Sequence, residues 1–176
     1  MLWVIIGIVI IILIFVCVFI FANNKFNLAV IKIDKAEEDI DIYLQKKSEL
    51  LDRTRPLIKK ELKLDKTMTA LDVVKEDETN FETHIRLKKA YNEFFKTLDE
   101  NEKLLKSESL LKILDELNEN EENIIGAIKF YNDTVVEYNQ LVVTFPSKVI
   151  AFFKKYKKLD FYNNEKREIF EILNKK

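Results

Sequence analysis

Hydrophobic residues follow two different patterns along the 176-residue chain. Residues 2–22 form an apolar run that contains no charged residue. From residue 25 onwards, apolar residues instead recur every three or four positions among charged ones, which is the spacing of amphipathic helices. No segment alternates apolar and polar residues as a half-buried strand would. The pattern therefore predicts an all-α chain, with one apolar helix followed by a helical bundle.

The apolar run has the length of a transmembrane helix. At about 1.5 Å per residue it would extend roughly 31 Å, and the hydrocarbon core of a bilayer is about 30 Å thick. Trp3 lies where an interfacial aromatic residue is typical, and Lys25 follows closely enough to reach the headgroups. A cleaved signal peptide would have a basic start, a shorter apolar stretch and a small-residue cleavage site, which this segment lacks. We expect an uncleaved anchor over residues 1–24, with lipid around residues 2–22.

Positive charges near the anchor predict its orientation. Lys25, Lys32 and Lys35 follow the apolar run, whereas only the α-amino group precedes it. Because Lys and Arg are enriched on the cytoplasmic side, we expect a single-pass cell-membrane protein with its N-terminus outside and its bulk domain, residues 25–176, in the cytoplasm.

The first stripe of the bundle domain runs on from the anchor. Lys47 and Thr54 interrupt it, and Pro56 lies within it, so we expect a kink or break near Thr54–Arg55. Its apolar or small members are Ile33, Ala36, Ile40, Leu44, Leu51, Ile58 and Leu62.

A connector over residues 65–79, with one short helical turn, precedes the second stripe. Thr79 and Glu82 have the spacing of a capping box, and the next helix is expected to restart after Ser107 or Ser109. The second stripe comprises Phe81, Ile85, Leu87, Tyr91, Phe94, Leu98 and Leu105.

The third stripe is a heptad seam of about five repeats. Its charged member, Glu121, is expected to reach solvent or a lysine on a facing helix. Because a residue before proline avoids helical geometry, the helix should end at Phe145-Pro146, after which Ser147 can cap a new helix. The seam comprises Leu110, Leu114, Leu117, Glu121, Ile124, Ile128, Tyr131, Val135, Tyr138, Val142 and Phe145.

A short helix is expected over residues 148–158, followed by a segment at 165–173 that packs back on the body. The apolar side of the short helix would carry Val149, Ile150, Phe153 and Tyr156. Long amphipathic helices joined by short connectors predict an antiparallel, up-down four-helix bundle.

The composition argues against several classes of function. Two Gly exclude glycine-rich phosphate loops, one Cys and one His exclude Cys/His zinc sites, and a net charge of −1 argues against nucleic-acid binding. A carboxylate metal site using Glu121 and Glu122 with residues 37–39 would need Glu-x-x-His pairs, and His84 cannot supply two. We therefore expect no catalytic activity, no cofactor, no metal and no nucleic acid.

A stretch near the C-terminus resembles a known family. Residues 131–147, YNDTVVEYNQLVVTFPS, contain two Tyr-Asn pairs seven residues apart, and Phe-Pro-Ser follows six residues later. This string is similar to the C-terminal motif of the LemA family. Two earlier stretches, Glu121-Glu122-Asn123-Ile124 and residues 33–51, are also similar to parts of the family's sequence. The chain departs from the family in having Asp52 where a proline is usual, and it lacks a His-Glu pair near residues 62–69. The resemblance implies one N-terminal span and a bromodomain-like up-down bundle, without a settled activity.

Two surfaces are candidates for function. Tyr131, Asn132, Tyr138, Asn139, Phe145 and Pro146 either line an amide-rich groove for a partner segment or fill the core, with the asparagines bonded to a neighbouring helix. Lys148, Phe152, Phe153, Lys154, Lys155, Lys157 and Lys158 either form a membrane-surface patch or close one end of the bundle with solvated lysines.

Taken together, these features predict a membrane-anchored interaction or scaffolding module with an unknown protein partner. The alternative is a sensory or signalling component that passes a change along a continuous anchor helix and dimerises through it. Self-association is left open by the sequence.

Overall fold

Every regular element in the described part of the chain is helical. The computed structural model describes residues 1–63, 67–74 and 78–162, so the expected segment at 165–173 lies outside it. Four α-helices are present in these residues: α1 (Leu2–Leu62), α2 (Asn80–Asp99), α3 (Glu108–Val143) and α4 (Ser147–Lys154). Two 3-10 helices, η1 (Thr69–Asp72) and η2 (Glu102–Lys106), lie in the connections. The predicted all-α class, in which helices pack on helices, is confirmed.

The chain divides into two compact units. Unit 1 comprises residues 1–36 and 129–176, and unit 2 comprises residues 37–128. Because α1 and α3 are long, each of them contributes residues to both units.

The first helix is longer than the sequence suggested. α1 has 61 residues and continues through Pro56, so the break expected near Thr54–Arg55 is wrong. Proline removes the donor for the carbonyl of Asp52, but Asp52 and Pro56 are exposed and water can satisfy that carbonyl. On the opposite side Leu51 and Ile58 are fully buried, and their packing holds the helix on both sides of the proline.

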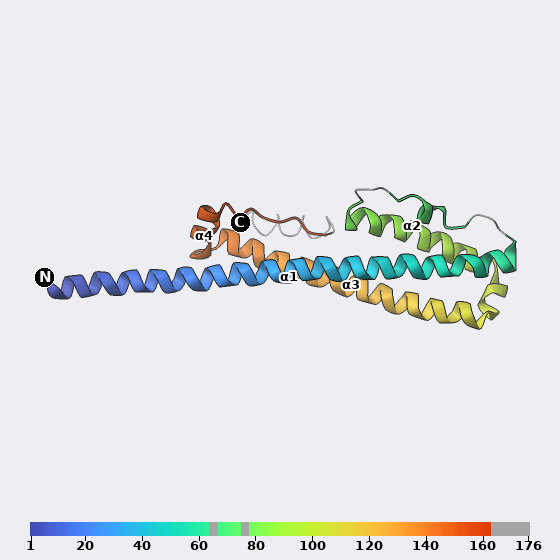
Figure 1. The fold of residues 1–176 in the computed structure, drawn as a ribbon, viewed down its shortest axis with the longest axis horizontal. Helices are drawn as coiled ribbons and strands as arrows, with labels where there is room; N and C mark the ends of the chain where they lie inside the picture. The colour runs from blue at the N-terminus through green and yellow to red at the C-terminus, as the bar shows by residue number, and fades with distance from the viewer. Residues whose placement is uncertain (64–66, 75–77, 163–176) are drawn as a thin grey trace. The chain divides into compact units, whose positions relative to one another are not determined.

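In unit 2, α3 is antiparallel to α1, whereas α2 runs parallel to it (Figure 1). The Asn80 side chain donates to the Glu37 carbonyl at 3.4 Å, and Tyr91 lies beside Lys47. Later residues of α2 thus meet later residues of α1, as expected for two helices that run in the same direction. The up-down order expected for successive helices therefore does not apply to α2. For α2 to start beside Glu37, the chain must go back about 38 Å along α1 from Leu62, at about 1.5 Å per helical residue. The 17 residues of the connection over 63–79 are enough, because extended chain covers about 3.3 Å per residue. The expected short turn within it is η1.

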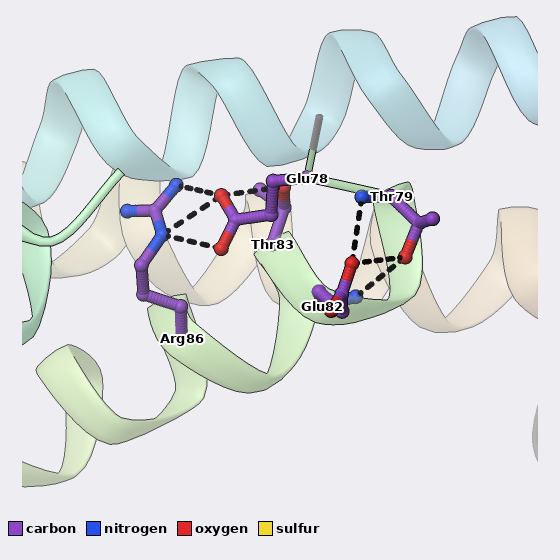
Figure 2. A network of polar contacts seen from close by, with 5 residues as sticks. All are labelled: Glu78, Thr79, Glu82, Thr83 and Arg86. Carbon is purple, nitrogen blue, oxygen red and sulfur yellow. Dashed lines mark hydrogen bonds and ion pairs between the residues drawn. The ribbon is translucent and has the colours of Figure 1, made fainter. Parts of the chain in front are cut away.

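A polar network fixes the start of α2 (Figure 2). The Thr79 hydroxyl accepts from the Glu82 N–H at 3.3 Å, and the Glu82 carboxylate accepts from the Thr79 N–H at 3.1 Å, which confirms the capping box. Beside it, Arg86 donates three hydrogen bonds to Glu78 at 2.8–3.0 Å, and the Thr83 hydroxyl donates a fourth. The bond from the Glu82 N–H satisfies one of the backbone donors that a helix N-terminus leaves free, and the bonds from Arg86 and Thr83 tie Glu78 to the first turns of α2.

The buried stripes of unit 2 follow the predicted spacing closely on α1 and α3. Lys47 and Thr54 complete the α1 stripe rather than interrupt it, since both are buried. On α2 the buried residues are Leu87, Ala90, Phe94 and Leu98, while Phe81 and Ile85 remain over 40 % exposed, contrary to expectation. Phe81 and Ile85 instead line an open groove with Ala70 and Val73 of the connection.

The core of unit 1 is formed where α1 meets α3 and α4. Ala22, Phe26, Ala29 and Ile33 of α1 pack with Val135, Tyr138, Ile150 and Ala151. The α3 helix begins directly after Ser107, as expected, but ends at Val143, and Phe145 is 76 % exposed.

The short helix α4 ends at Lys154 and buries a different face from the one predicted. Its buried residues Ser147, Ile150 and Ala151 lie at i, i+3 and i+4, whereas Val149 and Phe153 are exposed. The turn after α3 decides this, because it fixes which side of α4 meets α1. Ser147 is not the cap of α4; its hydroxyl donates to the Thr144 carbonyl at 2.9 Å.

Candidate functional site

The two asparagines of the Tyr-Asn pairs hold an extended segment of the same chain. The Asn139 side chain donates to the Leu159 carbonyl at 2.9 Å and accepts from the Leu159 N–H at 2.8 Å. Asn132 accepts from the Tyr162 N–H at 2.9 Å. Both asparagines are nearly fully buried, so these bonds replace water that the amides have lost. We call Asn132 and Asn139, with the backbone they bind at Leu159 and Tyr162, the asparagine clamp.

The tyrosines of the two pairs differ in environment. Tyr138 is 5 % exposed and its ring lies edge-on to Phe26, with 5.7 Å between centroids. Burial raises the pKa of the Tyr138 hydroxyl. Tyr131 is half-buried against Tyr162, at 6.1 Å between ring centroids. Tyr138 is therefore a core residue, while Tyr131 helps the clamp to hold the extended segment.

The clamp corrects one expectation about these residues. The asparagines bind an extended backbone segment, not a neighbouring helix. Sequence reasoning missed this partner because Leu159 and Tyr162 take part through their backbone, which carries no sequence signal.

Phe145 and Pro146, the last residues of that predicted set, line a groove in unit 1. It has a volume of about 510 Å³ and lies between residues 21–32 of α1 and residues 137–147. The Lys32 ammonium and the Glu137 carboxylate are 3.3 Å apart at its edge. The Lys25 ammonium lies 4.7 Å from the centroid of the Phe21 ring.

The lysine-rich surface of unit 1 combines exposed aromatic rings with exposed lysines. Phe152 and Phe153 are 79 % and 73 % exposed, although Ile150 and Ala151 beside them are buried. Lys154 donates to the Asn23 side chain. The other predicted members, Lys148, Lys155, Lys157 and Lys158, are also exposed. Trp3 is exposed near the start of α1.

A charged pair lies inside unit 2. The Lys47 ammonium is bound by both carboxylate oxygens of Glu121, with Oε2 at 2.7 Å, and it lies 4.7 Å from the centroid of the Tyr91 ring. Lys47 is 2 % exposed and Glu121 25 %. The expectation that Glu121 reaches a facing lysine is confirmed. Asn120 beside it donates to the Tyr43 carbonyl at 2.9 Å.

The buried charge changes the titration of its neighbours. Burial lowers the pKa of Lys47, while the hydrogen bond and charge of Glu121 act in the opposite direction. Burial also lowers the pKa of His84, and the positive charge of Lys47 lowers it further. Burial and the charge of Glu121 raise the pKa of Tyr91. Within residues 1–63, 67–74 and 78–162, no group of three or more His, Cys, Asp or Glu side chains is arranged to hold a metal ion.

Among the helices of the described residues, one, α1, is long and apolar enough to cross a membrane, by length and composition. None of its apolar window is buried. Comparison with protein families shows that the LemA family matches residues 36–172. The chain belongs to the LemA family. A search of curated proteins gave no match.

The LemA match covers most of the structural features described above. It contains the Lys47–Glu121 pair, the capping box of α2 and the asparagine clamp, whereas the apolar part of α1 precedes it. The resemblance to the LemA family that residues 131–147 indicated is thereby confirmed.

Proposed function

We propose that this LemA family protein is anchored in the cell membrane by residues 2–22 and that its helical domain recognises other proteins there. The observation that carries the proposal is the uninterrupted course of α1 from an apolar stretch with no buried residue in its most apolar window into a buried core. Confinement to the membrane raises the effective concentration of the domain for partners on the same surface. The proposal includes no catalytic role, cofactor or metal.

The anchor is tested first, because a signal sequence has similar length and composition. We expect the full chain to stay in the membrane after an alkaline wash, with the mass of all 176 residues. Replacing Ile12 and Phe15 with lysine should release it, because charges at the bilayer centre are costly. Loss of the first two dozen residues from the mature protein would overturn the proposal.

The interaction role is tested by crosslinking in intact membranes. The anchored chain should form specific adducts, and the released Ile12→Lys/Phe15→Lys variant at equal total amount should lose them. Equal adduct yields from both forms would show that the anchor does not serve recognition.

The proposed orientation has the N-terminus outside and the bulk domain in the cytoplasm. A Lys157→Cys variant in a Cys17→Ser background provides one thiol on the exposed surface of unit 1. A membrane-impermeant maleimide should label it only after cells are opened. Labelling of intact cells would reverse the orientation.

A signalling role is the second candidate, and the continuity of α1 through Asn23 and Asn24 favours it. A signalling rod should dimerise through α1, so oxidation of the exposed Cys17 in membranes should give a disulfide-linked dimer. Formation of this dimer should also fail when Asn23 and Asn24 are both replaced by glycine, since glycine weakens the helix that would join the two copies. A scaffold would retain its crosslinked partners in that variant.

A further inference from the structure

The position of α4 on α1 has a consequence for membrane contact. The buried side of α4 packs beside Ala22 and Phe26, and Lys154 donates to the Asn23 side chain. These α1 residues begin where the apolar run ends, so α4 lies within about one helical turn, roughly 5 Å, of the end of the span. The headgroup layer on each side of a bilayer is about 5–8 Å thick. The helix is therefore at headgroup level if residues 2–22 cross the membrane.

The outward side of this region is unusually apolar and basic. Phe145, Phe152 and Phe153 are all more than 70 % exposed. Phe145 lines the same groove as Phe21, which belongs to the apolar run. Five lysines and no acidic residue occur between residues 143 and 159. Aromatic rings beside lysines are typical of segments that lie on anionic membrane surfaces.

We propose that α4 and the turn before it form a second membrane contact, which inserts Phe145, Phe152 and Phe153 at the interface and binds anionic phospholipid headgroups through Lys148, Lys155, Lys157 and Lys158. This inference rests on the proposed anchor. The occupant is the lipid of the bilayer that α1 crosses, because contacts with Ala22, Asn23 and Phe26 keep α4 at that level. Contact at two places would restrict how the domain tilts over the membrane.

The test uses tryptophan as a depth probe in the full chain. Trp3 is the single tryptophan, so a Trp3→Phe background frees the signal for Phe153→Trp. The matched control is Phe130→Trp. Phe130 is an exposed residue of α3 in the same unit, and it lies 14 residues before Thr144, so it is about 21 Å away from the turn that leads into α4. Both variants are reconstituted in phosphatidylcholine vesicles with or without phosphatidylglycerol, and a lipid brominated in its acyl chains is the quencher.

We expect the lipid to quench Phe153→Trp at least about twofold more strongly than Phe130→Trp, and phosphatidylglycerol to increase the difference. Replacing Lys155, Lys157 and Lys158 with glutamine should remove the effect of phosphatidylglycerol. Phe152→Trp gives an independent probe if Phe153→Trp fails to fold. Two results would overturn this inference alone, provided that the protein resists an alkaline wash. One is equal quenching of the probe and the control, and the other is no effect of phosphatidylglycerol. Release of the protein by that wash would instead overturn the anchor.

Discussion

Lys47 on α1 and Glu121 on α3 are joined by a hydrogen-bonded ion pair, although each occupies a position that apolar residues fill elsewhere in its stripe. The Lys47 side chain is 2 % exposed, and Glu121 retains 25 % of its exposure. The cost of losing each partner therefore differs. Glu121 can be hydrated if Lys47 is lost, whereas the buried Lys47 ammonium cannot be hydrated if Glu121 is lost. The pair fixes which position of α1 faces which position of α3 within unit 2.

This inequality predicts that Glu121→Ala is more damaging than Lys47→Met. Removal of Glu121 leaves a buried positive charge and should cost about 3 kcal/mol of unfolding free energy, while Lys47→Met should cost less. The double variant Lys47→Met/Glu121→Leu should be close to wild type, because apolar residues of similar volume replace both charges. Thermal unfolding of the full chain in detergent, followed by circular dichroism, measures this order.

The control for the buried pair is the exposed pair Arg53–Glu116, at 3.3 Å between the same two helices. Arg53→Ala should change stability by less than about 1 kcal/mol. A Lys47→Met effect larger than that of Glu121→Ala would contradict the argument from burial.

Loss of Asn139 should open the clamp at one end. Asn139→Ala removes both bonds to Leu159, so the Leu159 amide should exchange with solvent at least about tenfold faster, while the Tyr162 amide, held by Asn132, keeps part of its protection. Asn132→Ala should produce the reverse pattern. Hydrogen exchange measured by mass spectrometry resolves the two ends. Unchanged exchange at Leu159 in Asn139→Ala would show that the clamp bonds do not hold the segment.

The capping box predicts a difference between two threonines of α2. Thr79→Ala removes the cap and should destabilise the fold by about 1 kcal/mol. Thr97→Ala, in the last turns of the same helix, should be nearly neutral, because its hydroxyl binds only the Glu93 carbonyl and alanine has a higher helix propensity. Thermal unfolding of the two variants compares them directly. Equal losses would mean that the cap contributes nothing.

His84 predicts a dependence of stability on pH. Burial and Lys47 lower its pKa in the folded state, and Lys88 adds to the shift while Glu121 opposes it. As pH falls through about 6.5, the unfolded chain binds a proton before the folded chain does, so stability decreases until pH drops below the folded pKa. His84→Gln should lose less stability than wild type between pH 7.5 and pH 5.5, measured by thermal unfolding. Since His84 is the single histidine, an equal loss in both proteins would contradict the prediction.

The sequence by itself determined the helical class, the apolar part of α1, the start of α2 and the spacing of the apolar positions that unit 2 buries on α1 and α3. These features depend on local spacing and local hydrogen bonds, which the order of residues specifies directly. It also carried the motifs that mark the LemA family.

Only the tertiary structure decided that Lys47 meets Glu121, that α2 runs parallel to α1, that α4 buries Ile150 and Ala151 but exposes Phe153, and that the asparagines bind backbone. Each of these depends on which surfaces far apart in the sequence come into contact. Helical periodicity shows that a face is buried but does not identify its partner, and a backbone N–H or carbonyl is the same at nearly every residue.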